Sequence, residues 1–263
     1  LRMKKIVRTS TSYGEMAYYK SDPTIGKSLK LYGEYCDQEV ELIKKHVNRS
    51  SFVLDVGANI GTHTLGIAPY VKLIMAIEPD PDNYALLKLN TDKCFSKNIK
   101  TSQLALGNDT AEVGTTFDYG KTRISPGNTV TCTTLDNIVF FAKTEMSTID
   151  FIKIDAEGME FPILLGAQQT LIHFKPKLLI EMQDASMNKV IYDLLDSLGY
   201  NMYWVTVPTY NPDNFKDNAT NVFGKQHGVL NWFCSKEHQS SMWQVTSNED
   251  NIEKLVIRQR KSV

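Results

Sequence analysis

A glycine-containing loop and an acid that follows it suggest a nucleoside-binding site. Residues 55–61 read Asp-Val-Gly-Ala-Asn-Ile-Gly and follow a short apolar run. Gly57 and Gly61 let the backbone pass close to a ligand and aim its amides at it. Glu78 ends the next apolar run, where a carboxylate can accept hydrogen bonds from both hydroxyls of a ribose. The loop lacks the middle glycine of the dinucleotide fingerprint, so the pattern favours an adenosyl ligand without a pyrophosphate over a dinucleotide. The alternative is a plain tight turn beside a solvated acid, which is less favoured because the loop and the acid fall at matching edges of adjacent strands.

A second group of acids falls where two later apolar runs end. Asp155 and Glu157 follow the run at 149–154, and Glu181 closes the next run. If the adenosyl ligand carries a sulfonium group, carboxylates beside it stabilise its positive charge. One of these carboxylates could also accept a proton from a hydroxyl group that attacks the ligand. We therefore predict Asp155, Glu157 and Glu181 as catalytic residues, with Glu157 as the first candidate for the base and Glu181 in reserve. The alternative is a helix N-terminus that favours acids, which best suits Glu160.

Metal-ion and histidine chemistry is less well supported by the sequence. The same three carboxylates could hold Mg²⁺, but no spacing demands a metal, so we predict no metal ligands. His63 follows the glycine loop and could act as a base, although packing or capping is the commoner role of a single histidine. The cysteines are far apart and suggest neither a zinc site nor a disulfide framework; they are Cys36, Cys94, Cys132 and Cys234.

Strands alternating with helices are expected to position these residues. This alternation is typical of a doubly wound, mostly parallel α/β sheet. The five apolar runs that we predict as strands are Phe52–Val56, Leu73–Ile77, Ile99–Ala105, Ile149–Ile154 and Lys177–Glu181. Asp80 can cap a helix whose first residue is Pro81. Apolar stripes predict two further helices that pack on the sheet, one over 159–171 and one over 190–198 that ends near Gly199.

The remaining segments divide the chain into three parts. Residues 107–131 are rich in turn-forming residues and predict an inserted β-hairpin with strands at Val113–Phe117 and Val130–Thr133. We expect an N-terminal extension at 1–35 that forms a flap over cofactor or substrate, a main domain at 36–240, and a peripheral segment at 241–263 with a charged helix near 248–260.

Composition narrows the classes of partner. The chain has 263 residues, 42% of them hydrophobic, and a formal net charge of -1. This balance suits a globular domain and gives no global field that would attract nucleic acid. No apolar run is long enough for a membrane span, and no signal-peptide pattern opens the sequence, so we predict a cytoplasmic protein.

Over roughly residues 32 to 234 the chain resembles the FkbM-type methyltransferases. Several motifs agree in order: Tyr32-Gly33-Glu34-Tyr35, the 55–61 loop with Thr62-His63-Thr64-Leu65, Glu78-Pro79, Leu135-Asp136, the run from Ile149 to Glu160, and Glu181. The segment from Tyr210 to Phe215 is similar to a late loop of that family. The resemblance suggests that this loop forms a lid on the substrate side. The segment near Tyr32 to Tyr35 and the loop from Tyr210 to Phe223 are both polar-aromatic and non-periodic, and we predict that they form a mobile acceptor side.

The resemblance implies a class I methyltransferase (Rossmann-like) sheet, S-adenosylmethionine as the methyl donor, and O-methylation of a hydroxyl on a sugar, glycan or natural product. The residues expected to bind the cofactor are Glu34, Tyr35, Asp55, Gly57, Ala58, Asn59, Gly61, Glu78, Pro79, Gln103, Ala105 and Asp155. The third strand lacks the acid that many class I enzymes place on the adenine amino group. Gln103 or backbone groups are expected to replace it.

Three other functions compete with this interpretation. An NAD-dependent oxidoreductase shares the ribose-binding acid but needs the missing glycine. A nucleic-acid methyltransferase is suggested by Asn211-Pro212, but that motif belongs after the fourth strand, and the neutral charge argues against it. A catalytically silent adenosyl-cofactor-binding module could share the fold. The sequence leaves the acceptor and the oligomeric state open.

Overall fold

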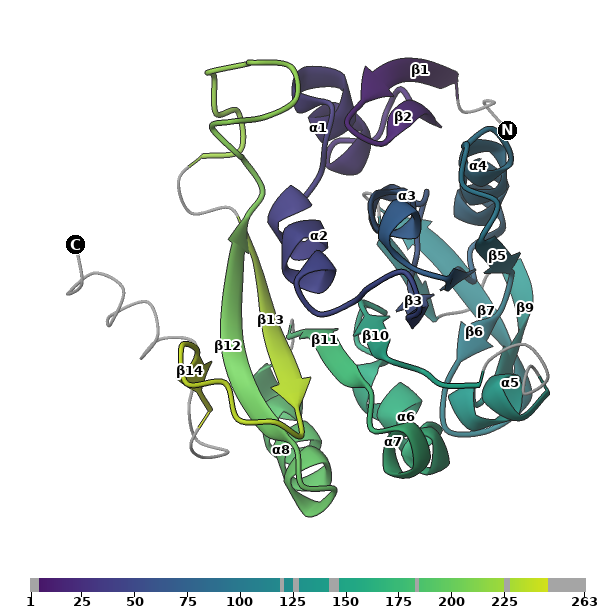
Figure 1. The fold of residues 1–263 in the computed structure, drawn as a ribbon. Coiled ribbons are helices and arrows are strands. Elements are labelled where there is room, and N and C mark those ends of the chain that lie inside the picture. The colour runs from purple at the N-terminus through teal and green to yellow at the C-terminus, as the bar shows by residue number, and fades with distance from the viewer. Residues whose placement is uncertain are drawn as a thin grey trace.

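An eight-stranded sheet runs through the part of the chain that the computed structural model describes, residues 5–118, 121–124, 128–141, 147–182, 185–224 and 228–245 (Figure 1). Five neighbouring strands are parallel, and β13 runs antiparallel to β11. The order across the sheet is β14 (Trp243–Gln244), β12 (Asn201–Pro208), β13 (Gly228–Ser235), β11 (Lys177–Glu181), β10 (Phe151–Ile154), β3 (Phe52–Val56), β4 (Leu73–Ile77) and β5 (Ile99–Ser102). The predicted doubly wound, mostly parallel sheet is confirmed.

The strand predictions were correct at three positions and too long at two. β3, β4 and β11 have the predicted bounds, and β10 begins at Phe151 rather than Ile149. The predicted single strand at 99–105 was wrong because the chain leaves the main sheet after Ser102. It then forms β6 (Ala105–Leu106), which pairs with a strand of a second sheet.

Side chains alternate between the two faces of the sheet, as the pleat of a strand requires. On one face, Leu54, Ile152 and Ile180 belong to the larger apolar core. That core also takes up side chains from α5 (Leu135–Phe141), α6 (Glu160–Leu165), α7 (Gln168–Phe174) and α8 (Asn188–Ser197). On the other face, Val53, Phe151 and Leu179 pack with α2 (Asp37–Lys44), α3 (Thr62–Ile67) and the 3-10 turn η1 (Ala68–Tyr70). The helices therefore cover both faces.

The helix signals were largely confirmed. Asp80 caps α4 (Pro81–Asp92), and its Oδ1 accepts hydrogen bonds from the amides of Asp82 and Asn83. A 3-10 turn, η2 (Ala185–Met187), leads into α8. The stripe at 159–171 packs in the core as predicted, but it spans two helices, α6 and α7. Between the two helices, Gly166 packs against the backbone of Gly107, where a side chain would collide with the carbonyl oxygen.

The inserted hairpin proves to be part of a larger antiparallel unit. β7 (Ala111–Asp118) and β9 (Asn128–Thr133) pair as predicted, and β8 (Lys121–Ile124) adds to the outer edge of β7. β9 also pairs with β6 in parallel, so these four strands form a separate sheet.

The two ends of the chain pack on this framework. β1 (Ile6–Thr11) and β2 (Gly14–Tyr19) form a hairpin that leads through α1 (Ile25–Tyr32) to α2. At the other end, β14 pairs with β12 and Val245 is buried, so the sheet reaches past the predicted boundary at residue 240. The charged helix expected near 248–260 lies outside the described residues. No described helix is long and apolar enough to cross a membrane.

Asn90 of α4 connects the N-terminal hairpin to the glycine loop. Its Oδ1 accepts from the Ala17 amide at 2.7 Å, and its Nδ2 donates to the carbonyls of Ala17 at 3.0 Å and Ile60 at 2.8 Å. The side chain is 2% exposed. Its loss would therefore leave three backbone groups without their partner in a buried site.

We predict that Asn90→Ala lowers the free energy of unfolding by about 1 to 3 kcal/mol, the cost of leaving buried hydrogen-bonding groups unsatisfied. Urea denaturation followed by circular dichroism measures this difference. Asn137→Ala is the matched control, because Asn137 is exposed on α5 and should change the stability by no more than about 0.5 kcal/mol. Equal effects of the two substitutions would contradict the prediction.

Candidate active site

A cavity opens at the carboxyl edge of the parallel strands, beside the boundary between β3 and β10 where the strand order reverses. Doubly wound sheets place their ligands at this position. The empty volume is about 1020 Å³, including the part open to solvent. The residues that line it include Tyr35, Cys36, Glu39, Gly57, Ala58, Asn59, His63, Glu78, Pro79, Leu104, Ala105, Leu106, Lys153, Asp155, Glu157, Met159, Ile163, Glu181 and Val229.

The glycine loop packs directly on the end of β10. Gly57 has a φ of 78°, and a side chain there would collide with the carbonyl oxygen of Asp155. The amides of Gly57 and Ala58 donate to the carbonyl of Ile77, which joins the loop to β4. Glycine at 57 is therefore required both by the backbone conformation and by the close approach of the two strand ends.

Glu78 is held in place by the backbone on both sides. Its Oε2 accepts from the amide of Asn59 and its Oε1 from the amide of Asp80, each at 2.9 Å. The residue is 2% exposed and lines the cavity. A carboxylate oxygen can accept more than one hydrogen bond, so this oriented group can also receive hydroxyl donors from the cavity.

The segment from the end of β5 through β6 offers an apolar surface. Leu104, Ala105 and Leu106 line the cavity, together with Met159 and Ile163 from the opposite side. Gln103 was expected to contact the cofactor, but its side chain is exposed and does not line the cavity. The turn between β5 and β6 directs it away, which leaves backbone and apolar groups on this wall.

A buried lysine that the sequence analysis missed lies beside Asp155. The ammonium of Lys153 is 3.1 Å from Asp155 Oδ2 and 3.8 Å from Asp55 Oδ1. Burial raises the pKa of Asp155, but the charge and the hydrogen bond of Lys153, a hydrogen bond with Glu181 and the influence of His63 together lower it to about 2. Burial likewise disfavours the charged amine, yet Asp155 and Asp55 raise the pKa of Lys153 above its usual value. The pair is therefore ionised at neutral pH.

Asp55 supports the cavity from beneath instead of lining it. It is fully buried, and its Oδ2 accepts from the hydroxyl of Thr64 at 2.5 Å. Gly61 is also outside the lining, where it precedes α3 with a φ of 95°. Both were expected to bind the cofactor, and the structure places both behind the residues that face the cavity.

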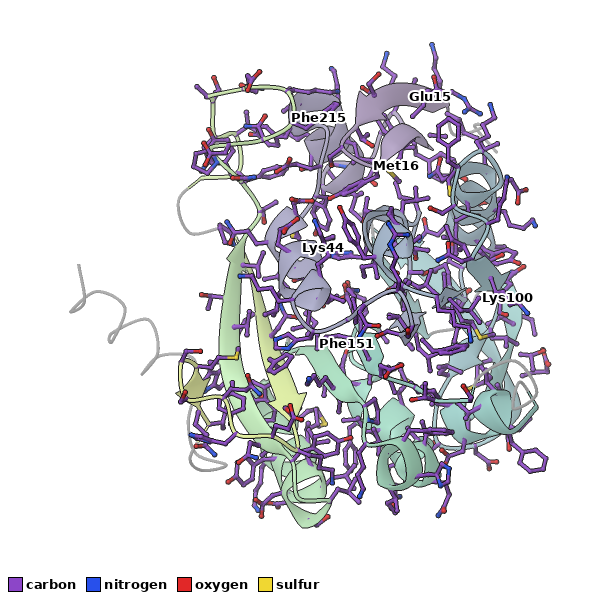
Figure 2. The ribbon with its side chains drawn as sticks, viewed as in Figure 1. Glu15, Met16, Lys44, Lys100, Phe151 and Phe215 are labelled. Carbon is purple, nitrogen blue, oxygen red and sulfur yellow. The ribbon has the colours of Figure 1, made fainter. Side chains whose placement is uncertain are left out.

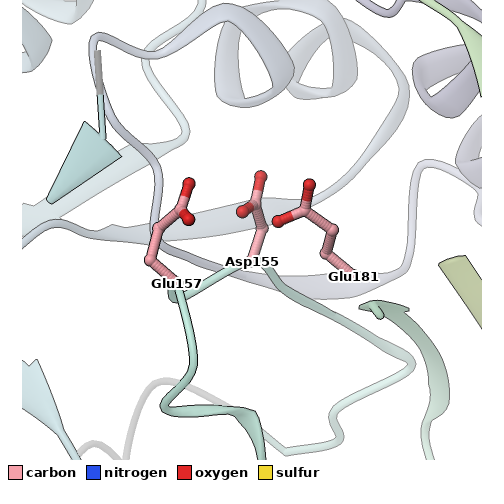
Figure 3. A group of neighbouring side chains, drawn as sticks. All are labelled: Asp155, Glu157 and Glu181. Carbon is pink, nitrogen blue, oxygen red and sulfur yellow. The ribbon is translucent and has the colours of Figure 1, made fainter. Parts of the chain in front are cut away.

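Three carboxylates meet where β10 and β11 end, on the other side of the glycine loop from Glu78. Asp155, Glu157 and Glu181 point to the same side of the strand ends, with Asp155 in the middle (Figure 3). Glu157 has a φ of 51° and Gly158 a φ of 96°, so two left-handed residues form the turn. Glu160 braces it by accepting from the amides of Ala156 and Gly158. Glu160 thus has the structural role at the start of a helix that its position suggested.

The same three carboxylates could hold a metal ion. One oxygen from each lies within 4.8 Å of the others, and carboxylates are ligands of hard cations. Acidic groups also gather in this way without an ion, so we assign no metal.

His63 lies in the cavity wall in a second buried polar group. Its Nε2 is 2.9 Å from Glu39 Oε2, and Glu39 Oε1 accepts from Asn231 Nδ2 at 2.9 Å. These residues come from α3, α2 and β13. Neither Glu39 nor Asn231 carried a local sequence signal, because their partners are far away in the chain.

The N-terminal segment supplies one wall and holds the late loop. Tyr35 lines the cavity beside Cys36, and burial raises the pKa of both side chains. Glu34 was expected to bind the cofactor but does not line the cavity. Its carboxylate accepts instead from Asn211 Nδ2 at 2.9 Å and from the amide of Phe215 at 3.0 Å.

Tyr32 adds to this contact between the two segments proposed to form a lid. Its hydroxyl donates to the carbonyl of Thr220 and accepts from the amide of Val222. The ring of Tyr210 packs edge-on against Tyr32, and Phe215 lies beside α1 (Figure 2). The structure brings the two segments together, and their movement stays a prediction.

The structure therefore gathers most of the predicted site residues. Those that line the cavity are Tyr35, Gly57, Ala58, Asn59, Glu78, Pro79, Ala105, Asp155, Glu157 and Glu181. Those that do not are Glu34, Asp55, Gly61 and Gln103.

Comparison with known proteins identifies the family of the chain. The methyltransferase FkbM domain matches residues 55–202, more than half of the chain. The hexuronic acid methyltransferase AglP of Haloferax volcanii is 25% identical over 135 residues, which are 50% of this chain and 56% of AglP. The match thus spans little more than half the length of that relative.

Two solved structures resemble the fold. The methyltransferase FkbM of Methylobacillus flagellatus has a TM-score of 0.49 at 22% identity. The match covers 71% of this chain and 44% of the Methylobacillus protein. The SAM-dependent methyltransferase of Agrobacterium tumefaciens has a TM-score of 0.52 at 11% identity. That match covers 90% of this chain and 72% of the Agrobacterium protein. The second similarity shows the fold, which is that of class I methyltransferases.

The matched region contains the glycine loop, Glu78 and all three carboxylates of the cavity. The chain therefore belongs to the FkbM family of methyltransferases.

Proposed function

We propose that this methyltransferase uses S-adenosylmethionine and methylates a hydroxyl group on a sugar, glycan or related small molecule. The observation that carries the proposal is that Glu78, the glycine loop and the three carboxylates line one cavity. They follow β4, β3, and β10 with β11, which are neighbours in that order in the sheet. The match to AglP, whose name gives a hexuronic acid as its substrate, supports a sugar acceptor.

The residues of the cavity fit an adenosyl cofactor. Glu78 offers an oriented carboxylate to the ribose hydroxyls, and the backbone of Gly57 to Asn59 can approach the ligand closely. Leu104, Leu106 and Ile163 form an apolar wall suited to the adenine ring. The absence of the dinucleotide glycine pattern argues against NAD in the same place.

The acidic end suits the transfer itself. When bound, the cofactor supplies a methyl group made electrophilic by its sulfonium charge. Asp155, kept ionised by Lys153, gives that end of the cavity a fixed negative charge. Glu157 and Glu181 are close enough to Asp155 to meet an acceptor hydroxyl there. We propose Glu157 as the group that accepts the hydroxyl proton, since a neutral hydroxyl is a poor nucleophile.

The ribose assignment predicts that Glu78→Gln weakens S-adenosylhomocysteine binding by about 1 to 3 kcal/mol. Glutamine keeps the shape but replaces one acceptor oxygen with a donor, so one hydroxyl contact is lost. Isothermal titration calorimetry measures the affinity. Glu112→Gln serves as the control because Glu112 is exposed on β7.

An affinity of Glu78→Gln equal to that of the wild type would exclude this contact. NAD should show no comparable binding to the wild-type protein. Binding of NAD as tight as that of S-adenosylhomocysteine would favour the oxidoreductase alternative.

For the base, we expect Glu157→Gln to lower kcat by about 100-fold or more while leaving the cofactor affinity nearly unchanged. The amide cannot accept a proton but fills the same space. The assay follows release of S-adenosylhomocysteine with a panel of neutral and acidic sugars as acceptors. A nearly normal kcat would assign Glu157 to acceptor positioning, and a loss of cofactor affinity would place it among the cofactor contacts.

A further inference from the structure

Lys153 occupies a position that its strand otherwise gives to apolar residues. It lies on β10 opposite Asp55 of β3 and Leu179 of β11, on the face where Phe151 and Val53 enter an apolar core. It is 2% exposed. An ammonium group at such a site is unfavourable unless carboxylates and hydrogen bonds replace its water.

Two carboxylates take the place of water around the ammonium of Lys153. One is buried in the protein, and the other is partly exposed to the cavity. Asp55 is fully buried beneath the glycine loop, 3.8 Å from the ammonium and bonded to Thr64. Asp155 is 3.1 Å from the ammonium, and its side chain is 31% exposed where it lines the cavity. Lys153 therefore links a fixed internal anchor to a carboxylate that a ligand can reach.

We propose that Lys153 is a positioning residue that fixes Asp155 as an anion at the cavity wall, so that the site prefers a sulfonium over the uncharged thioether left after transfer. The proposal rests on the proposed function, because it assumes that S-adenosylmethionine binds in this cavity.

Stability alone does not account for Lys153. Well-packed apolar residues often replace buried ion pairs with no loss of stability, and Phe151 and Leu179 beside Lys153 are already such residues. The other ionisable groups around Asp155 are three carboxylates and three further side chains: Glu39, Glu157, Glu181, Tyr35, Cys36 and His63. Among the described residues that line the cavity, Lys153 is the one lysine or arginine. Without it, Asp155 would share its surroundings with other carboxylates, which favours protonation or rotation of the side chain.

The test compares the affinities of S-adenosylmethionine and S-adenosylhomocysteine by calorimetry at pH 7.5. EDTA in the buffer removes any cation from the carboxylates. We expect Lys153→Met to lower the preference for the sulfonium, measured as the ratio of the two dissociation constants, by about tenfold, the effect of one modest charge interaction. Lys153→Arg should keep the ratio within about twofold of the wild type, because guanidinium retains the charge.

The matched control is Lys177→Met on the neighbouring strand β11. Lys177 lies at the opposite end of its strand and pairs with Glu237 at 3.5 Å, so its loss should leave the ratio unchanged. Asp155→Asn should lower the ratio as much as Lys153→Met does. In the Asp155→Asn background, Lys153→Met should then not lower the ratio further, because the lysine favours the sulfonium only through Asp155.

A folded Lys153→Met protein whose ratio equals or exceeds that of the wild type overturns the proposal. An equal loss of both affinities also overturns it, because it indicates a purely structural role. If Lys153→Met does not fold, the ratios measured with Asp155→Asn and Lys153→Arg test the proposal instead. An unchanged ratio in Asp155→Asn overturns the proposal. Failure of the wild-type protein to bind either compound instead refutes the proposed function itself. Thermal denaturation of each variant establishes which of them fold.

Discussion

The close contact between Gly57 and the carbonyl of Asp155 is the constraint on which the rest of the site depends. It brings the loop after β3 against the end of β10, at the point where the strand order reverses. Glu78 lies on one side of this contact and the three carboxylates on the other. Any side chain at position 57 would separate the two strand ends, and the two halves of the cavity would no longer face a single ligand.

The charged groups beneath this contact have to be satisfied inside the protein. Asp55, Lys153 and Asp155 form one group, of which only Asp155 is partly exposed, and the buried side chains of His63, Glu39 and Asn231 form another. Each contains members from different strands or helices, so each forms only when those elements are correctly packed. The same interactions that hold the elements together therefore also determine the charge at the acidic end of the cavity.

Much of the fold follows from local patterns, while the site follows from them only in part. The apolar runs of β3, β4 and β11 and the cap at Asp80 are visible in the sequence because their causes lie within a few residues. Glu78 and Asp155 were found because strand ends converge on one edge of a sheet. Lys153, Glu39 and Asn231 were missed because their partners come from other elements, and a single sequence does not pair them. Gln103 was misplaced because the break after β5 depends on pairing with β9.

The segment before β3 has a consequence for how this fold can diversify. It lies outside the region shared with the FkbM domain, yet it provides Tyr35, Cys36 and Glu39 to the cavity and binds the late loop through Glu34. A protein trimmed to the shared region would lose one side of its cavity. Conversely, substitutions in this segment can change the wall formed by Tyr35, Cys36 and Glu39 while the glycine loop and Glu78 stay as they are, so the two sides of the cavity can vary independently.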